Sequence, residues 1–124
     1  MSSVRDKCAE SFPVDNFVHE QNVLRFSERL ETENDQTARV QLTKLLLDEE
    51  NKFAASSERL DRADRHIAKC KQHIARQYSL IDKLKMDGHD IAPAERLLRN
   101  LMELHDLFVG YRRQVATALA RTTL

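Results

Sequence analysis

Three residues with metal-binding side chains recur at helical spacing near the middle of the chain. His66, Cys70 and His73 follow the pattern H-x3-C-x2-H, which places them along one edge of a helix. Imidazole nitrogens and thiolates are ligands that Zn²⁺ prefers, and a structural site needs four of them. His105 lies level with His73 in an antiparallel helix pair, but on the opposite flank. We therefore expect no resident metal, and a metal-binding or metal-sensing protein that uses these three residues is an alternative hypothesis.

His19 raises the question of phosphoryl transfer, because histidine phosphotransfer domains are helical bundles of about this size. The phosphoaccepting histidine of those domains is typically followed by a Lys-Gly pair, which leaves room for a docking partner. Here Glu20 and then Gln21-Asn22-Val23 follow His19, so the sequence departs from that pattern. A histidine phosphotransfer-like signalling protein is a second alternative. We expect His19 itself to be a partly covered histidine at the edge of the core.

No group of residues indicates catalysis. The carboxylates of Asp48, Glu49 and Glu50 are consecutive on a predicted helix, so they fan out over roughly 200° instead of converging on a substrate. The two glycines, Gly88 and Gly110, are far apart in the sequence, which excludes a Gly-rich phosphate loop. We therefore predict a protein that is not an enzyme and has no cofactor.

The charge is balanced overall but divided along the chain. Residues 1–58 carry 7 basic and 12 acidic side chains, whereas residues 59–124 carry 13 basic and 8 acidic ones. The cations of the second half do not share one helix face and have almost no aromatic neighbours for base stacking. We therefore expect no nucleic-acid partner. The cations considered are Arg65, Lys69, Lys71, Arg76, Lys83 and Lys85.

The sequence indicates a cytoplasmic protein. Its two cysteines, Cys8 and Cys70, show no C-x2-C spacing and are too few for a disulfide framework. The first 20 residues contain four acidic side chains and no continuous apolar run, so they do not resemble a signal peptide. The longest uncharged stretch late in the chain, Gln114–Ala120, is far shorter than the ~20 apolar residues of a membrane span.

The low content of 2 Gly and 2 Pro predicts an all-α fold. We expect a disordered leader over residues 1–14 and a single helical domain over 15–124. In this domain, a long central helix at about 36–87 has shorter antiparallel helices, at about 16–31 and 91–120, folded back on each end as in a coiled coil. Asp35, Gly88 and Asp90 provide the expected helix caps and stop. The alternative is a compact four-helix bundle with a break near residues 54–57.

A row of large apolar residues, one every seven positions, supports the continuous central helix. The row is Leu46, Phe53, Leu60, Ile67, Ile74 and Ile81. The antiparallel turn at Gly88 is expected to place Ile67 opposite Tyr111, Cys70 opposite Phe108, Ile74 opposite Leu104 and Ile81 opposite Leu97. On the other side, we expect Phe26 near Leu42 and Val23 near Leu45. Gly110, inside the last helix, is expected to mark close packing.

Four further apolar residues lie off this main row. Val40 and Leu47 are seven residues apart on the predicted central helix, and Leu98 and Met102 lie on the last helix. Three helices would leave them in water, so we expect them to contact a second copy of the chain or another helical protein. The sequence therefore predicts a non-enzymatic protein–protein interaction module, which forms a homodimer.

Two stretches resemble helical hairpins of small bacterial proteins. Residues 74–84 match the pattern I-A-x-Q-x-x-L-I-x-x-L, and Gly88-His89-Asp90 and residues 94–98 match the G-H-D and A-x-x-L-L that follow it. This hairpin is typical of the rhizobial branch of proteobacteria. Residues 30–35 are similar to a second bacterial hairpin, L-E-T-E-x-D, in which Pro often follows; here Gln36 follows.

Together the two resemblances cover roughly residues 20–112. They imply a bacterial, cytosolic and helical protein, and they imply no activity. His89 is the histidine most similar to the pattern, so the turn formed by Gly88, His89 and Asp90 is a candidate for a functional contact. A local structural role for the same turn, between a helix stop and a helix start, is the competing interpretation.

Overall fold

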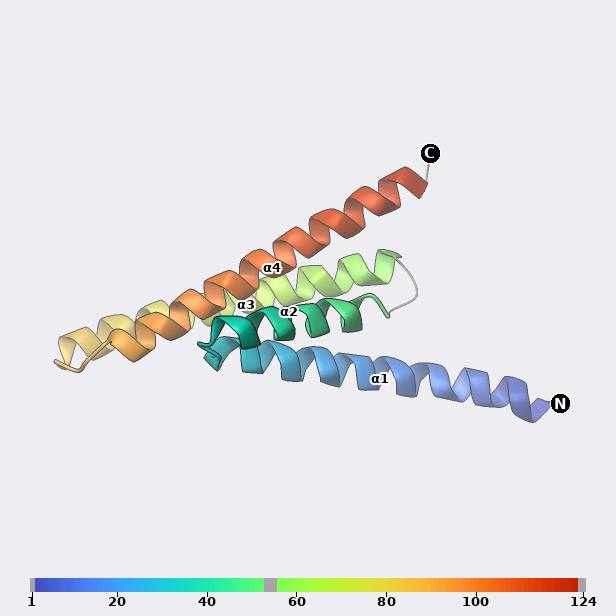
Figure 1. The fold of residues 1–124 in the computed structure, drawn as a ribbon, viewed down its shortest axis with the longest axis horizontal. Coiled ribbons are helices and arrows are strands. Elements are labelled where there is room, and N and C mark those ends of the chain that lie inside the picture. Colours follow the sequence, from blue (N-terminus) through green and yellow to red (C-terminus); the bar gives the residue numbers. More distant parts are fainter. Residues whose placement is uncertain (1, 53–55, 123–124) are drawn as a thin grey trace.

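The structure, a computed structural model, describes the backbone of residues 2–52 and 56–122 and the side chains of residues 17–52 and 58–122. These ranges form four α-helices and no strand: α1 (Ser2–Thr32), α2 (Gln36–Glu50), α3 (Ser56–Met86) and α4 (Ala92–Thr122). The predicted all-α class is confirmed. Figure 1 shows two antiparallel hairpins, α1–α2 and α3–α4, that pack against each other in the middle of the molecule.

The long central helix expected at about 36–87 is wrong, because the chain reverses between α2 and α3. In one continuous helix, residues 50 and 62 would lie about 18 Å apart. Instead, Arg62 Nε donates to Glu50 Oε2 over 3.4 Å, so α3 folds back beside α2. The alternative with a break near residues 54–57 is confirmed, since α2 ends at Glu50 and α3 begins at Ser56.

The seven-residue row is divided between two helices whose core faces are in phase. Leu46 lies on α2, and Phe53 lies outside the described residues. On α3, Ile67 and Ile74 are half-buried and Ile81 is buried. A periodic row shows that apolar residues share a face, but it does not show that the helix is unbroken.

α1 begins at Ser2, earlier than the start predicted at about residue 16. The segment 1–14, expected to be a disordered leader, therefore has a helical backbone from Ser2 onward. Extending an existing helix gains one hydrogen bond for each residue fixed, whereas starting a new helix is costly. The N-terminal part of α1 extends beyond the centre of the bundle, as does the C-terminal part of α4 (Figure 1).

The turn between α1 and α2 is held by a cap and by two buried side chains. Asp35 Oδ2 accepts a hydrogen bond of 2.9 Å from a first-turn N–H of α2, as predicted. The buried Arg39 guanidinium donates to the Leu30 carbonyl over 2.6 Å. From α4, Asn100 Nδ2 donates to the Glu31 carbonyl over 2.9 Å. Two carbonyls in the last turn of α1, those of Leu30 and Glu31, are therefore satisfied by side chains of α2 and α4.

The turn between α3 and α4 also has the predicted form. Gly88 has a φ of 76°, a backbone conformation that favours glycine. The N–H of His89 donates to the Leu84 carbonyl over 2.9 Å, and that of Gly88 to the Lys85 carbonyl over 3.1 Å. This pair of bonds is the Schellman motif. Asp90 Oδ1 then accepts an N–H at the start of α4 over 3.1 Å.

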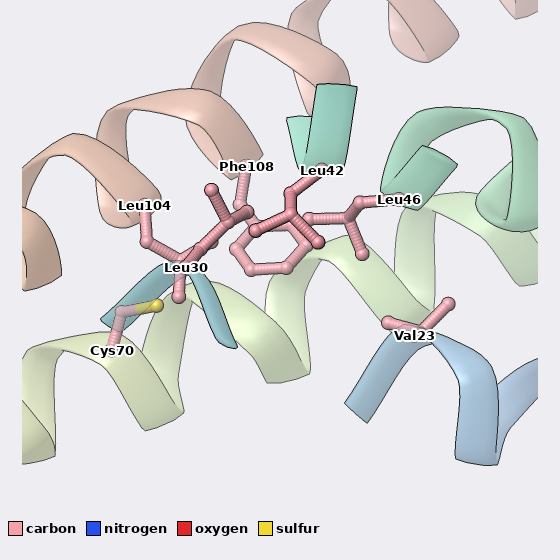
Figure 2. Packing of buried hydrophobic residues seen from close by; sticks show 7 residues of the cluster. All are labelled: Val23, Leu30, Leu42, Leu46, Cys70, Leu104 and Phe108. Atoms are coloured by element: carbon pink, nitrogen blue, oxygen red, sulfur yellow. The ribbon is translucent and has the colours of Figure 1, made fainter. Parts of the chain in front are cut away.

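One apolar cluster joins all four helices. The predicted meeting of Cys70 with Phe108 is confirmed, because both belong to this cluster. The predicted place of Leu45 is wrong: its side chain is 47% exposed, and its neighbour Leu46 is the one that is fully buried. Figure 2 shows the seven buried side chains converging. They are Val23, Leu30, Leu42, Leu46, Cys70, Leu104 and Phe108.

The expectation that Gly110 marks close packing is wrong, since a Cβ added there would meet no atom within 4 Å.

We predict that Gly110→Ala raises the free energy of unfolding by up to about 1 kcal/mol, because Ala is the better helix former. Gly88→Ala should lower it by about 1–2 kcal/mol, because alanine does not favour a positive φ. Chemical denaturation measures the free energy of unfolding of both variants. A change in the same direction in both would contradict the different roles given to Gly110 and Gly88.

Candidate functional site

Three consecutive residues at the end of α2 each contact a different helix. Glu49 contacts α1, Glu50 contacts α3, and Asn51, the C-cap residue, contacts α4. The sequence predicted that the carboxylates here point in different directions, and the structure shows that Glu49 and Glu50 contact different helices. These residues connect the helices of the bundle and do not converge on a substrate.

Glu50 is the centre of a buried charge network. Its side chain is 0% exposed and that of Arg62 is 3% exposed; Arg62 Nε and Nη2 each donate to a Glu50 oxygen over 3.4 Å. His66 Nε2 lies 3.0 Å from Glu50 Oε1. Arg62 Nη1 also lies 3.4 Å from the exposed carboxylate of Glu20 on α1. The buried charges are therefore compensated by partners on three helices.

His19 lies at the edge of the core, partly covered as predicted. Its Nδ1 is 2.8 Å from Glu49 Oε2, and its side chain is 23% exposed. Burial raises the pKa of Glu49, but hydrogen bonds from Lys52 and His19 outweigh burial and leave this pKa below its ordinary value. The Glu49 carboxylate thus orients the Nδ1 edge of the imidazole ring toward α2.

The three candidate metal ligands line one cavity but do not form a ligand set. Within the described part of the chain, no three His, Cys, Asp or Glu side chains are grouped so that they could hold a metal ion. His66 is directed to Glu50, and His73 Nδ1 lies 4.0 Å from Glu31 Oε2. Burial raises the pKa of the Cys70 thiol to about 11, which favours the protonated thiol over the thiolate that a metal requires.

A cavity of about 330 Å³ separates α1 from α3. Its floor is part of the core, formed by Cys70, Leu104 and Phe108, and the ring of His66 stacks on Phe108 at 4.7 Å. The sequence predicted none of this, because the cavity depends on the separation of two helices that do not follow each other in the chain.

Two of the four predicted interaction residues are covered by the chain itself. Leu98 is 9% exposed, and Leu47 packs against the cluster of Ala63, Tyr111 and Val115. Four helices provide more cover than the three that were expected, which is why these two are not left in water. Val40 and Met102 stay exposed, at 59% and 43%.

The predicted turn of Gly88, His89 and Asp90 lies at the far end of the α3–α4 hairpin (Figure 1). Its three residues are exposed. The backbone of Gly88 and His89 closes α3, and the carboxylate of Asp90 caps α4. The structure thus gives the turn the local structural role that was the competing interpretation.

The outer flanks of α3 and α4 form an apolar seam on the side away from α1 and α2. On α3, the side chains of His66 and His73 contact α2 and α1. Ile67 and Ile74 come one residue later, and successive helical side chains point about 100° apart. They therefore lie on the other flank. We define the outer seam as Ile74 and Tyr78 of α3 with Met102 and Val109 of α4.

The α4 side of the outer seam follows from the same geometry. Asn100 bonds to the end of α1, and Leu107 packs toward α2. Met102 and Val109 come two residues later, about 200° around the helix. An ion pair between Asp64 and Arg112 joins the two helices near one end. The sequence assigned Ile67 and Ile74 to the core, and Ile67 does pack against the cluster that joins all four helices. What the sequence analysis missed is Tyr78, which is 50% exposed on the same helix.

No family model, curated protein or solved structure matches this chain. In the described ranges, none of the helices has an apolar stretch of the length and hydropathy that crossing a membrane requires.

Proposed function

We propose that the protein is a non-enzymatic interaction module that self-associates through the outer seam. The observation that carries this proposal is the exposure of large apolar side chains there: Tyr78 is 50% exposed and Met102 43% exposed, beside half-buried Ile74 and Val109. Two α3–α4 hairpins stacked on this face would form a four-helix layer, in which the side chains leave water.

The charges favour a second copy as the partner. The cations Arg62 and Lys69 on the inner flank of α3 lie beside acidic residues of α1, within the same chain. The outer flank instead carries both signs, with Asp64 paired to Arg112. An isologous two-fold contact joins a surface to a second copy of itself, so residues of opposite sign on this flank can pair between the two copies.

Light scattering tests this proposal. The expected mass is twice the chain's 14.4 kDa. Met102→Glu should reduce it to one chain, because a dimer would bury a carboxylate without a partner. Met86→Glu is the matched control, since Met86 is 87% exposed at the end of α3 and outside the seam. Val40→Glu should also leave the mass unchanged. A wild-type monomer, or dissociation by Met86→Glu as well, would refute the proposal.

We propose the kind of organism and the cell compartment of the protein from its sequence. The resemblance of residues 74–98 to the rhizobial hairpin supports a bacterial source, and the lack of a paired-cysteine pattern supports the cytoplasm. The buried free thiol of Cys70 is compatible with a reducing compartment.

A further inference from the structure

The cavity between α1 and α3 has a pair of oppositely charged or polar side chains joining the two helices at each end. Arg62 reaches Glu20 at one end over 3.4 Å, and His73 reaches Glu31 at the other over 4.0 Å. The two paired residues of each helix are eleven positions apart, which is about 16 Å at 1.5 Å per residue. The equal spacing means that α1 and α3 run parallel between the two pairs.

The middle of the cavity is hollow because its walls carry small side chains there. Ser27 on α1 and Cys70 on α3 both line it. Side chains of this size do not fill the distance between two separated helices. The cavity is partly open to solvent and has a volume of about 330 Å³. It falls within the range of small-molecule sites, about 300 to 1,000 Å³.

The lining favours an uncharged, flat ligand. The floor consists of Leu104, Phe108 and the thiol of Cys70, with the His66 ring stacked on Phe108 at an interplanar angle of 20°. Aromatic side chains favour stacked ring partners. Both charge signs occur at the rim, with Glu28 on α1 and cations on α3, so the rim does not select a charged ligand.

One polar atom of the walls is available to a ligand. Ser27 Oγ is buried without a hydrogen-bond partner, whereas His66 Nε2 lies 3.0 Å from Glu50 Oε1. A buried polar group without a hydrogen bond has a free-energy cost. A ligand that carries one hydrogen-bonding group removes this cost at Ser27, whose hydroxyl turns about a single bond.

We propose that this cavity binds a planar, uncharged aromatic molecule of two fused rings that carries one N–H or hydroxyl group, with Ser27 as its hydrogen-bond partner. A smaller apolar cavity of about 150 Å³ accommodates a single benzene ring, so 330 Å³ suits two rings. The site is separate from the outer seam and does not depend on self-association.

Indole is the probe, and its fluorescence has no tryptophan background because the chain has no Trp. We expect saturable binding by the full chain. Ser27→Leu fills the cavity and should abolish binding, whereas Ser79→Leu, the same change at an exposed site of α3, should leave it unchanged. Ser27→Ala should weaken indole about threefold to tenfold and leave naphthalene, which lacks the N–H, unaffected.

Lack of saturable binding by the wild type, or wild-type affinity in Ser27→Leu, would overturn the proposal. A second measurement needs no substitution in the wall. In a Cys8→Ser variant, Cys70 is the remaining thiol, and indole bound over it should slow alkylation of Cys70 several-fold. Equal alkylation rates with and without saturating indole would also overturn it. Met102→Glu should bind indole as the wild type does.

Discussion

Glu50→Gln is expected to lower the free energy of unfolding by about 3–5 kcal/mol. The Glu50 side chain is 0% exposed, and it faces the Arg62 guanidinium, whose side chain is 3% exposed. Neutralising Glu50 leaves that guanidinium buried without its buried counter-charge. The same change removes the carboxylate that His66 faces. Urea denaturation followed by circular dichroism measures the loss.

Glu20→Gln is the matched control for this prediction. Glu20 contacts the same guanidinium, but its side chain is 56% exposed, and an exposed ion pair contributes about 1 kcal/mol or less. The two variants therefore make the same chemical change at the two ends of one network. Equal losses in both variants would mean that the network is not desolvated and that α2 and α3 are not held together by it.

Local signals were sufficient to predict the turns. The hydrogen bonds at Asp35, Gly88 and Asp90 span two to five residues, so the roles of these residues do not depend on the rest of the fold. The register of the α3–α4 hairpin followed from the turn at Gly88, and Cys70 and Phe108 meet in the core as predicted.

The break between α2 and α3 could not be predicted with the same certainty, because no Gly or Pro occurs over residues 36–87. What holds the chain reversed is tertiary: Glu50 pairs with Arg62, and Tyr111 donates to Asn51 Oδ1 over 3.0 Å. A sequence periodicity records which residues share a face, but it contains no information on partners elsewhere in the chain.

The candidate sites were less predictable than the fold. The histidines were recognised by type, but their carboxylate partners Glu31, Glu49 and Glu50 come from other helices. The cavity depends on the distance between α1 and α3, and the outer seam depends on which flank of α3 faces α1. Both are properties of the four-helix arrangement, which the expected three-helix arrangement does not share.

Leu46→Ala is expected to lower the free energy of unfolding by about 2–5 kcal/mol. Leu46 is 0% exposed and packs in the cluster that joins all four helices (Figure 2). Removing its branched end loses the transfer free energy of the buried methyl groups and leaves a void that the surrounding helices fill only in part. Thermal or urea denaturation measures this cost.

Leu45→Ala is the control, with the same residue types one position earlier on α2. Leu45 is 47% exposed, and alanine is at least as good a helix former as leucine, so this variant should cost less than about 1 kcal/mol. The sequence pattern placed Leu45 against Val23, whereas the structure places Leu46 in that cluster. Comparing the two losses of stability therefore shows which residue of α2 faces the core. A larger loss for Leu45→Ala would mean that α2 is rotated by about 100° about its own axis from the orientation described. That result would refute the four-helix core.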